Sequence, residues 1–312
     1  MTRQALLFPG QGSQSIGMGR DVASASPVAA EVFRKADSVL GYGLSHICFE
    51  GPDAKLECTD IQQPAIFVTS VAVWEALREK GVSLSWFEAA AGLSLGEYSA
   101  LHVAGSLSFE DGLRLVQRRG QLMQEAAEAN PSGMVSLVGA DEAAARTLCE
   151  KAAQGEVLSP ANFNCPGQIV ISGSRAACGR ALEMAGEVGC RAVPLKVAGA
   201  FHSALMASAA EGLAAALASA PVRSPSIPVI SNVTGEPHGD PESIRTALVQ
   251  QLTHPVLWQR SMERLVGRGL QRFVEVGAGR VLKGLMRKMD RAAEVVNVGT
   301  AAELDANLSP RS

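Results

Sequence analysis

Short apolar segments alternate with helical patterns along the whole chain, and this alternation limits the possible folds more than any other feature. Residues 64–80 carry apolar side chains at helical spacing and are followed by Gly81, a helix stop. Strands separated by helices build parallel sheets, so the sequence predicts an α/β protein with a mostly parallel sheet. The strand-like segments lie at residues 4–8, 87–93, 227–231, 272–276 and 294–298.

The middle of the chain has its own order of elements, β-α-β-β-α-β, which is a split βαβ arrangement. Its strand and helix patterns lie at residues 134–140, 141–153, 157–163, 168–172, 174–188 and 191–197. We therefore expect an inserted subdomain at residues 130–197. It would divide a larger α/β domain into residues 1–129 and 198–312.

The charge balance and the apolar runs exclude two classes of partner. The 312 residues include 28 Lys and Arg against 31 Asp and Glu, a formal net charge of −3. Nucleic-acid binding needs a concentrated basic surface, so we expect no nucleic-acid partner. No apolar run reaches the roughly 18 residues of a membrane span, and the N-terminal residues lack the apolar run of a signal peptide. We expect a cytoplasmic protein with no membrane partner.

Cysteine and histidine spacings argue against a metal site. The six cysteines form no Cys-x-x-Cys pair, and the five histidines form no His-Glu-x-x-His motif. We expect reduced thiols and no bound metal.

The sequence Gly-Leu-Ser-Leu-Gly at residues 92–96 follows a predicted strand and precedes a helical pattern. This is the context of a G-x-S-x-G nucleophile elbow, a tight turn that presents its serine above the sheet. Ser94 is the candidate nucleophile, and the N–H of Leu95 would point to where an oxyanion forms. The alternative is structural, because Ser94 and Glu97 also fit a capping box that only begins the helix.

A serine nucleophile needs a base, and two histidines are candidates. His202 follows a predicted strand within the sequence Gly-Ala-Phe-His-Ser. His102 lies in the helix predicted after Ser94, and we expect it to face away from the elbow. A surface or core position without a catalytic role is the alternative for His202.

Three further segments carry candidate binding groups. The glycine-rich loop at residues 9–14 follows the first strand, and the N–H of Gln11 is a candidate oxyanion donor unless the loop is an ordinary turn. Arg119, predicted at the end of a helical stretch, could bind a carboxylate through two hydrogen bonds, unless it is a solvated surface residue. The Gly-x-Gly at residues 277–279 has Leu282 where a dinucleotide fingerprint needs its third glycine, so we expect no dinucleotide site.

Together and in this order, the motifs resemble the malonyl-CoA:acyl-carrier-protein transacylase family. The resemblance implies a hydrolase-like α/β domain with an inserted ferredoxin-like subdomain. It extends over nearly the whole chain, at residues 7–14, 92–98, 119–120, 162–168, 201–203, 231–235, 251–258 and 275–279.

The resemblance implies the catalytic roles. Ser94 is the nucleophile and His202 is its base. Backbone N–H groups of Gln11 and Leu95 form the oxyanion hole.

The resemblance also implies how substrate and base are held. Arg119 binds the free carboxylate of the malonyl group, and the backbone carbonyl of Gln251 orients His202. Phe201 is similar to the residue found in malonyl-selective members. Leu93 departs from the family, which usually has histidine there; that histidine is not the base, so we expect the chemistry to be retained.

The implied reaction transfers malonyl from malonyl-CoA to the phosphopantetheine thiol of acyl carrier protein in fatty-acid biosynthesis. It proceeds through a malonyl-serine by a ping-pong mechanism, with no metal or other cofactor, in a monomer. Basic residues at 280–291 are candidates for contacting an acidic carrier protein, unless they form only a solvated helix face. Other functions to be weighed are a trans-acting acyltransferase of a polyketide pathway, an esterase-like serine hydrolase, and a carrier-protein-docking subunit without catalysis.

Overall fold

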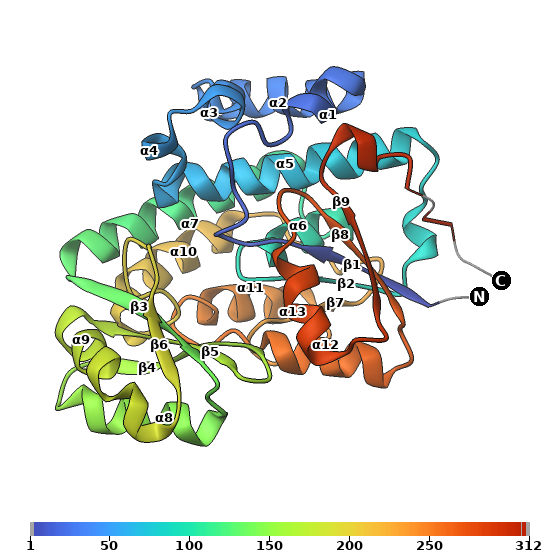
Figure 1. Ribbon diagram of the computed structural model, residues 1–312. Coiled ribbons are helices and arrows are strands. Elements are labelled where there is room, and N and C mark those ends of the chain that lie inside the picture. The colour runs from blue at the N-terminus through green and yellow to red at the C-terminus, as the bar shows by residue number, and fades with distance from the viewer. Residues whose placement is uncertain (1–2, 307, 310–312) are drawn as a thin grey trace.

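The computed structural model describes residues 3–306 and 308–309, and within them the chain forms two separate sheets (Figure 1). The central sheet is parallel throughout, which confirms the predicted α/β class. Its strand order is β7 (Val229–Ile230), β2 (Ala89–Gly92), β1 (Gln4–Phe8), β8 (Arg272–Val276) and β9 (Glu294–Val298).

Helices bury both faces of the central sheet. Leu6 and Phe8 of β1 belong to one apolar cluster, whereas Ala5 and Leu7 belong to another, because side chains alternate along a strand. The second cluster lies under α12 (Trp258–Gly267) and α13 (Val281–Met289). The first cluster includes residues of α5 (Thr59–Glu79), α6 (Gly96–Val103), α7 (Phe109–Ala129), α10 (Ala207–Ser219) and α11 (Pro241–Gln250).

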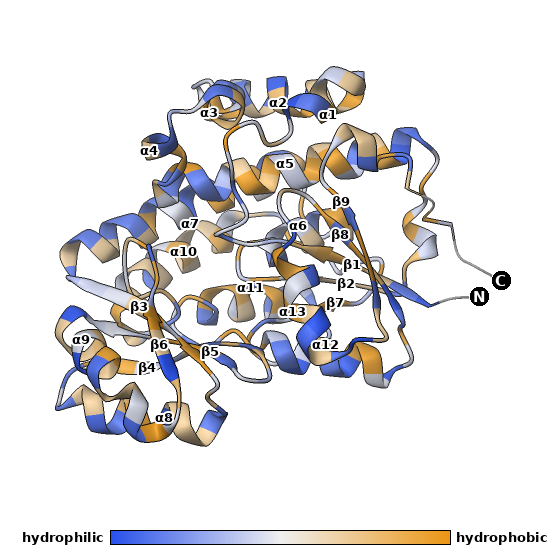
Figure 2. Cartoon of the chain, in the orientation of Figure 1, coloured by the Kyte–Doolittle hydropathy of each residue, from blue (hydrophilic) through white to orange (hydrophobic). Residues whose placement is uncertain are grey.

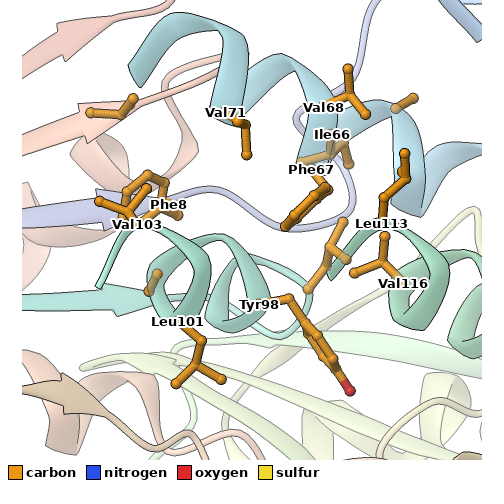
Figure 3. Close-up of a cluster of buried hydrophobic side chains, with 14 of the residues drawn as sticks. Phe8, Ile66, Phe67, Val68, Val71, Tyr98, Leu101, Val103, Leu113 and Val116 are labelled. Atoms are coloured by element: carbon orange, nitrogen blue, oxygen red, sulfur yellow. The ribbon is translucent and has the colours of Figure 1, made fainter. Parts of the chain in front are cut away.

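The first cluster fixes the position of α6, the helix that begins at the nucleophile elbow. Figure 3 shows Phe8 of β1, Phe67 of α5 and Leu101 of α6 within it, with Val116 of α7 close by. The colouring of Figure 2 shows the corresponding pattern, with the central strands largely apolar and hydrophilic residues along the outer helices. Rigid packing on several elements holds the turn before α6 in place.

The second sheet is antiparallel and lies beside the first (Figure 1). Its helices α8 (Glu142–Ala153) and α9 (Arg175–Met184) pack on one face, around Val135 and Ile171. Together these elements give the expected ferredoxin-like order β-α-β-β-α-β. The strand order is β4 (Leu158–Cys165), β5 (Gln168–Ser174), β3 (Ser132–Val138) and β6 (Arg191–Pro194).

The second sheet is also joined to the segment that follows α11. The Phe163 N–H donates to the Val256 carbonyl at 2.9 Å, and the Val256 N–H donates to the Ala161 carbonyl at 2.8 Å. These two hydrogen bonds fix the chain a few residues after Gln251, a residue of the candidate active site.

Several element limits differ from those predicted. The long helix begins at Thr59 rather than 64, with Pro64 inside it, where the missing N–H removes one backbone hydrogen bond. Strand β6 ends at Pro194, and the predicted helix at 174–188 finishes as the 3-10 turn η2 (Ala185–Val188). The remaining elements are α1 (Arg20–Ala25), α2 (Pro27–Leu40), α3 (Leu44–Glu50), α4 (Asp53–Leu56), η1 (Leu84–Trp86), η3 (Ala204–Met206) and η4 (Ala301–Glu303).

Across residues 3–306 and 308–309, no helix combines the length and the apolar character that a membrane crossing demands.

Candidate active site

Ser94 lies at the sharp turn between β2 and α6, with its backbone in the left-handed region at φ 52°. Such strain gathers at functional sites. Both flanking glycines are required, since a Cβ on Gly92 would lie 1.9 Å from the backbone of Gly96, and one on Gly96 would lie 2.1 Å from the Phe8 carbonyl oxygen. Asn232 fixes the turn: its Oδ1 accepts from the Ser94 N–H at 2.6 Å, and its Nδ2 donates to the Gly92 carbonyl at 2.7 Å.

His202 faces Ser94 and also has a left-handed backbone, at φ 59°. Its Nδ1 donates to the Gln251 carbonyl at 2.6 Å, and its Nε2 lies 2.9 Å from Ser94 Oγ. A proton on Nδ1 leaves Nε2 free to accept the serine proton. Burial, reinforced by the positive charge of Arg119, lowers the pKa of His202 to about 4, so the imidazole is neutral near pH 7.

Arg119 lies in the middle of α7, not at the end of a helix as predicted, and is 0% exposed. Its Nη1 donates to Gln63 Oε1 at 2.6 Å, and its Nη2 donates to Ser94 Oγ at 3.1 Å and to Gln251 Oε1 at 2.8 Å. Gly120 lets α7 approach the start of α5, since a Cβ there would lie 2.7 Å from a backbone oxygen of α5. A solvated position, the alternative for this arginine, is wrong.

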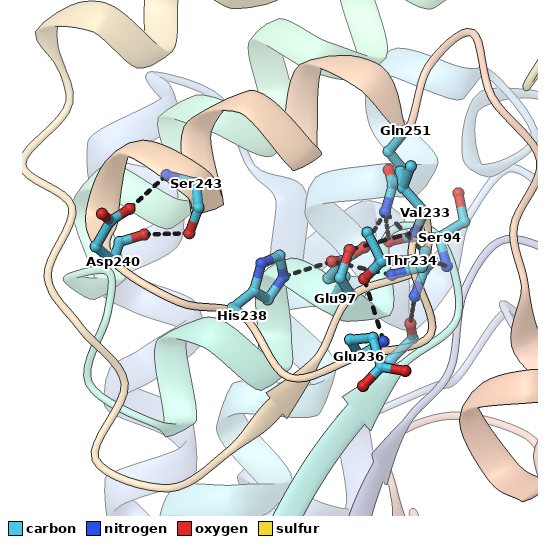
Figure 4. A network of polar contacts seen from close by, with 12 residues as sticks. Ser94, Glu97, Val233, Thr234, Glu236, His238, Asp240, Ser243 and Gln251 are labelled. Atoms are coloured by element: carbon cyan, nitrogen blue, oxygen red, sulfur yellow. Dashed lines mark hydrogen bonds and ion pairs between the residues drawn. The ribbon is translucent and has the colours of Figure 1, made fainter. Parts of the chain in front are cut away.

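Gln251 connects the parts of the site. Its backbone carbonyl accepts a hydrogen bond from His202 Nδ1, and its side-chain oxygen accepts one from Arg119 Nη2. Its amide nitrogen donates to the Ser94 carbonyl at 3.0 Å. The same nitrogen donates to Glu97, which in turn contacts His238 (Figure 4). One residue therefore holds both the base and the guanidinium.

The two candidate oxyanion donors belong to the elbow itself and to the loop that packs on it. Leu95 precedes the first turn of α6, where backbone N–H groups have no partner within the helix. The loop of Gln11 packs directly on the elbow, because a Cβ on Gly10 would lie 2.3 Å from the Leu93 carbonyl oxygen. The Gln11 side chain donates to Gln62 and lines a pocket of about 570 Å³ together with Phe201.

Two alternatives raised by the sequence do not hold. Ser94 makes no capping box, because α6 begins without a side-chain cap and the Ser94 hydroxyl contacts His202 and Arg119 instead. His102 faces away from the elbow, as expected. Its Nδ1 lies 3.0 Å from the Leu107 carbonyl, and its ring packs beside Phe67 and Phe109.

The remaining candidate binding groups have structural roles. Glu275 fills the position where a dinucleotide phosphate would lie, since its carboxylate accepts the backbone N–H groups of Leu282 and Lys283 at the start of α13. In the described part of the chain, no cluster of three or more His, Cys, Asp or Glu side chains is suited to a metal ion. All six cysteines are free thiols.

Comparison with known proteins identifies the family. The model of the acyl transferase domain matches residues 5–305. The chain belongs to this family. Relatives include a malonyl CoA-acyl carrier protein transacylase of Salmonella typhimurium, which is 41% identical over 310 residues, covering 99% of this chain and 100% of that protein. The polyketide biosynthesis protein ThaF of Burkholderia thailandensis is 41% identical over 320 residues, covering 100% of this chain and 27% of that protein.

A solved structure extends the likeness of this acyl transferase to three dimensions. It is described as a type II PKS acyl-carrier protein in complex with its malonyl-transacylase, and its TM-score is 0.95 at 40% identity. The match covers 98% of this chain and 99% of that one. The hydrolase-like domain with a ferredoxin-like subdomain is thus confirmed.

Four polar residues of this acyl transferase site were not predicted as functional: Gln63, Asn232, Glu97 and His238. Asn232 had the best signal, because a polar residue directly after a strand of a parallel sheet lies at the edge where ligands bind. Gln63 carries no sequence signal of its own, and Glu97 was noted only as part of a capping box with Ser94. The Leu93 side chain, at the position where the resemblance implies a histidine, packs in the apolar cluster on the second face of the sheet and offers no polar group to the site.

Proposed function

We propose that this acyl transferase moves malonyl from malonyl-CoA to the phosphopantetheine thiol of acyl carrier protein. The observation that carries the proposal is the position of Ser94 Oγ, 2.9 Å from His202 Nε2 and 3.1 Å from Arg119 Nη2. Nucleophile, base and a buried cation thus meet at one atom. The names of the transacylase relatives support malonyl-CoA as donor and acyl carrier protein as acceptor.

The first half-reaction forms an ester on Ser94. His202 takes the hydroxyl proton while Ser94 Oγ attacks the thioester carbonyl, and the tetrahedral intermediate collapses with loss of the CoA thiolate. His202 then gives its proton to that leaving group. Arg119 binds the malonyl carboxylate, and backbone N–H groups of Gln11 and Leu95 stabilise the oxyanion by about 3–4 kcal/mol per donor.

The second half-reaction reverses the first with a different thiol. The carrier thiol gives its proton to neutral His202 and attacks the malonyl-serine, and His202 returns that proton to Ser94. One thioester replaces another, so no metal, redox group or other cofactor takes part in the proposed chemistry. We also propose a monomer, with residues 130–197 as the inserted subdomain. The free thiols fit a reducing compartment, so a cytoplasmic location is part of the proposal.

The carrier protein is proposed to dock on the basic face of α13. Lys283, Arg287 and Lys288 of α13 line a pocket of about 840 Å³ together with Asp290 and Arg291, which follow the helix. Arg280 differs from them, because it forms an ion pair with Glu303 at 2.7 Å. The cations of α12 contribute less, since Arg260 and Arg264 both pair with Glu236.

The alternatives differ in what they leave unexplained. A role in a polyketide pathway uses the same chemistry, and the likeness to ThaF keeps it open. An esterase-like hydrolase orients its histidine with a carboxylate, whereas His202 Nδ1 donates to a backbone carbonyl, and it gives Arg119 no function. A docking subunit without catalysis has no use for a serine hydrogen-bonded to a neutral histidine.

Intact-protein mass spectrometry tests the proposal. After mixing with malonyl-CoA, we expect a stable malonyl adduct that maps to Ser94 and disappears when phosphopantetheinylated carrier protein is added. Ser94→Ala is the control and should form no adduct. Steady hydrolysis of malonyl-CoA without any acceptor would favour the esterase, and absence of an adduct would favour the docking subunit. Comparing carrier proteins from fatty-acid and polyketide pathways separates the two transferase functions.

A further inference from the structure

Glu97 and His238 form a buried pair beside the active site that the mechanism above does not use. Each side chain is 1% exposed, and His238 Nε2 lies 2.7 Å from Glu97 Oε1. Glu97 lies in the first turn of α6, directly after the elbow, and His238 lies after β7. A carboxylate buried to this extent is destabilising unless it is well hydrogen-bonded, so its partners indicate its role.

The partners of Glu97 lead to Gln251. Oε1 accepts from His238 and from the Asn232 N–H at 3.3 Å, and Oε2 accepts from Gln251 Nε2. Figure 4 shows Glu97 between His238 and Gln251, close to Ser94. The carboxylate is thereby held from one side by the imidazole and holds the amide on the other.

This contact fixes the orientation of the Gln251 amide. Its nitrogen faces three acceptors, the Ser94 carbonyl at 3.0 Å, Asn232 Oδ1 at 3.3 Å and Glu97 Oε2. Its oxygen faces the Arg119 guanidinium at 2.8 Å. An amide turned by half a rotation would place its N–H groups against the guanidinium and its oxygen against the carboxylate, so only one orientation is favourable.

The charges of Arg119 and Glu97 also link these two residues. In the part of the chain that the structure describes, the hydrogen-bond acceptors of Arg119 are two side-chain amides and a hydroxyl, all neutral. Burial lowers the pKa of Arg119, and the nearby Tyr98 and Glu97 oppose this. The Gln251 amide lies between the negative charge of Glu97 and the Arg119 guanidinium. The charge of Glu97 therefore acts on Arg119 from a distance, and among the described residues no carboxylate is hydrogen-bonded to the guanidinium.

We propose that Glu97, fixed by His238, is a positioning residue for malonyl recognition: it orients the Gln251 amide and, through it, the Arg119 guanidinium. The inference rests on the proposed role of Arg119. His238 has a part in this positioning because its hydrogen bond holds the side-chain conformation of Glu97. Acetyl donors have no free carboxylate, so their binding depends less on how Arg119 is oriented.

The test is the Glu97→Gln variant, with acylation of Ser94 measured separately for malonyl-CoA and acetyl-CoA. The variant keeps the shape of the side chain but removes its charge. We expect the ratio of kcat/KM for malonyl over acetyl to fall roughly tenfold, as for the loss of a hydrogen bond to a charged group. The loss should be mainly in KM for malonyl-CoA. A higher ratio would mean that removing a negative charge simply strengthens Arg119, and it would overturn the proposal.

Two further variants keep the test decisive. Glu275→Gln is the matched control, because Glu275 is also a fully buried carboxylate with amide donors, and it should leave the ratio unchanged. His238→Leu loosens Glu97 without removing its charge and should lower the ratio by a smaller factor. It also decides the matter if Glu97→Gln fails to fold.

The outcomes separate the two proposals. An unchanged ratio in the folded variants, or an equal loss for both donors, would overturn the role of Glu97 while wild-type malonyl-Ser94 still formed. Absence of malonyl-Ser94 in the wild type would instead overturn the proposed function. A double variant, Glu97→Gln with Gln251→Leu, should lose no more selectivity than Gln251→Leu alone, since both act through one amide.

Discussion

Among residues 3–306 and 308–309, two arginines are almost completely buried, and they are held in different ways. Arg272 in β8 is 2% exposed, lies 3.5 Å from the carboxylate of Glu294, and donates to the Ser309 carbonyl at 3.2 Å. Arg119 in α7 is 0% exposed, and its hydrogen-bond acceptors are two amides and a hydroxyl. A buried guanidinium with a carboxylate partner serves the fold. One with only neutral partners is suited to a charged substrate.

Replacing Arg119 is the strongest way to break this comparison. In Arg119→Ala we expect the kcat/KM for malonyl transfer to fall roughly 100-fold or more, because the malonyl carboxylate would be buried without a partner. Transfer of acetyl should be retained or gained. Parallel rate measurements with the two donors check this, and an unchanged preference for malonyl would show that Arg119 does not bind the carboxylate.

Replacing Arg272 should give the opposite pattern. We expect Arg272→Met to lower the free energy of unfolding by about 2 kcal/mol, because hydrogen bonds of a buried cation are lost. The preference for malonyl over acetyl should stay as in the wild type. Urea unfolding followed by circular dichroism measures the first quantity, and donor competition measures the second. A change in preference would mean that burial alone, not the kind of partner, determines function.

The acid limb of the pH profile sharpens the comparison further. Since the pKa of His202 is about 4, acetyl loading by the wild type should remain steady down to about pH 5 and fall only as the imidazole becomes protonated. The positive charge of Arg119 contributes to that low pKa. Arg119→Ala should therefore raise it and move the acid limb to higher pH. An acid limb at the same pH in the variant and the wild type would show that burial alone lowers the pKa of His202.

Exposed cations should give the smallest effect. Reversing the charges of Lys283 and Arg287 on α13 should raise KM for the carrier protein roughly threefold, because solvated charges are screened. Formation of malonyl-Ser94 from malonyl-CoA should be unaffected. Carrier titrations at low and high salt provide the measurement. An unchanged KM at low salt would leave this face as a solvated helix surface.

Local sequence predicted the parts of the site that depend on backbone geometry. The turn at Ser94 was recognisable because glycines are needed on both sides, and the close backbone contacts at Gly92 and Gly96 give the reason. Both limits of strand β1 were predicted correctly, because a strand buried on both faces is a nearly continuous apolar run in the sequence. Arg119, by contrast, was predicted at a helix end and lies in the middle of α7, since a helical pattern alone does not mark where a long helix stops.

The connecting residues could not be found in this way. Gln63, Glu97 and the segment that holds Asn232 and His238 lie far apart in the chain, and each of these residues becomes significant only through a partner on another element. The sequence does not distinguish a polar side chain that is buried from one that is exposed. Their roles follow from burial and hydrogen bonding, which depend on the whole fold.

By itself, the sequence determined a parallel α/β protein, an inserted β-α-β-β-α-β segment and a serine on a glycine-flanked turn, because these follow from spacing, small residues and local backbone preference. Only the tertiary structure decided that the hydrogen-bond partners of buried Arg119 within the described residues are neutral groups, that His202 is neutral, and that Gln251 joins them. The reason is physical. Desolvation and charge act across space, so they are set by segments that meet only when the chain has folded.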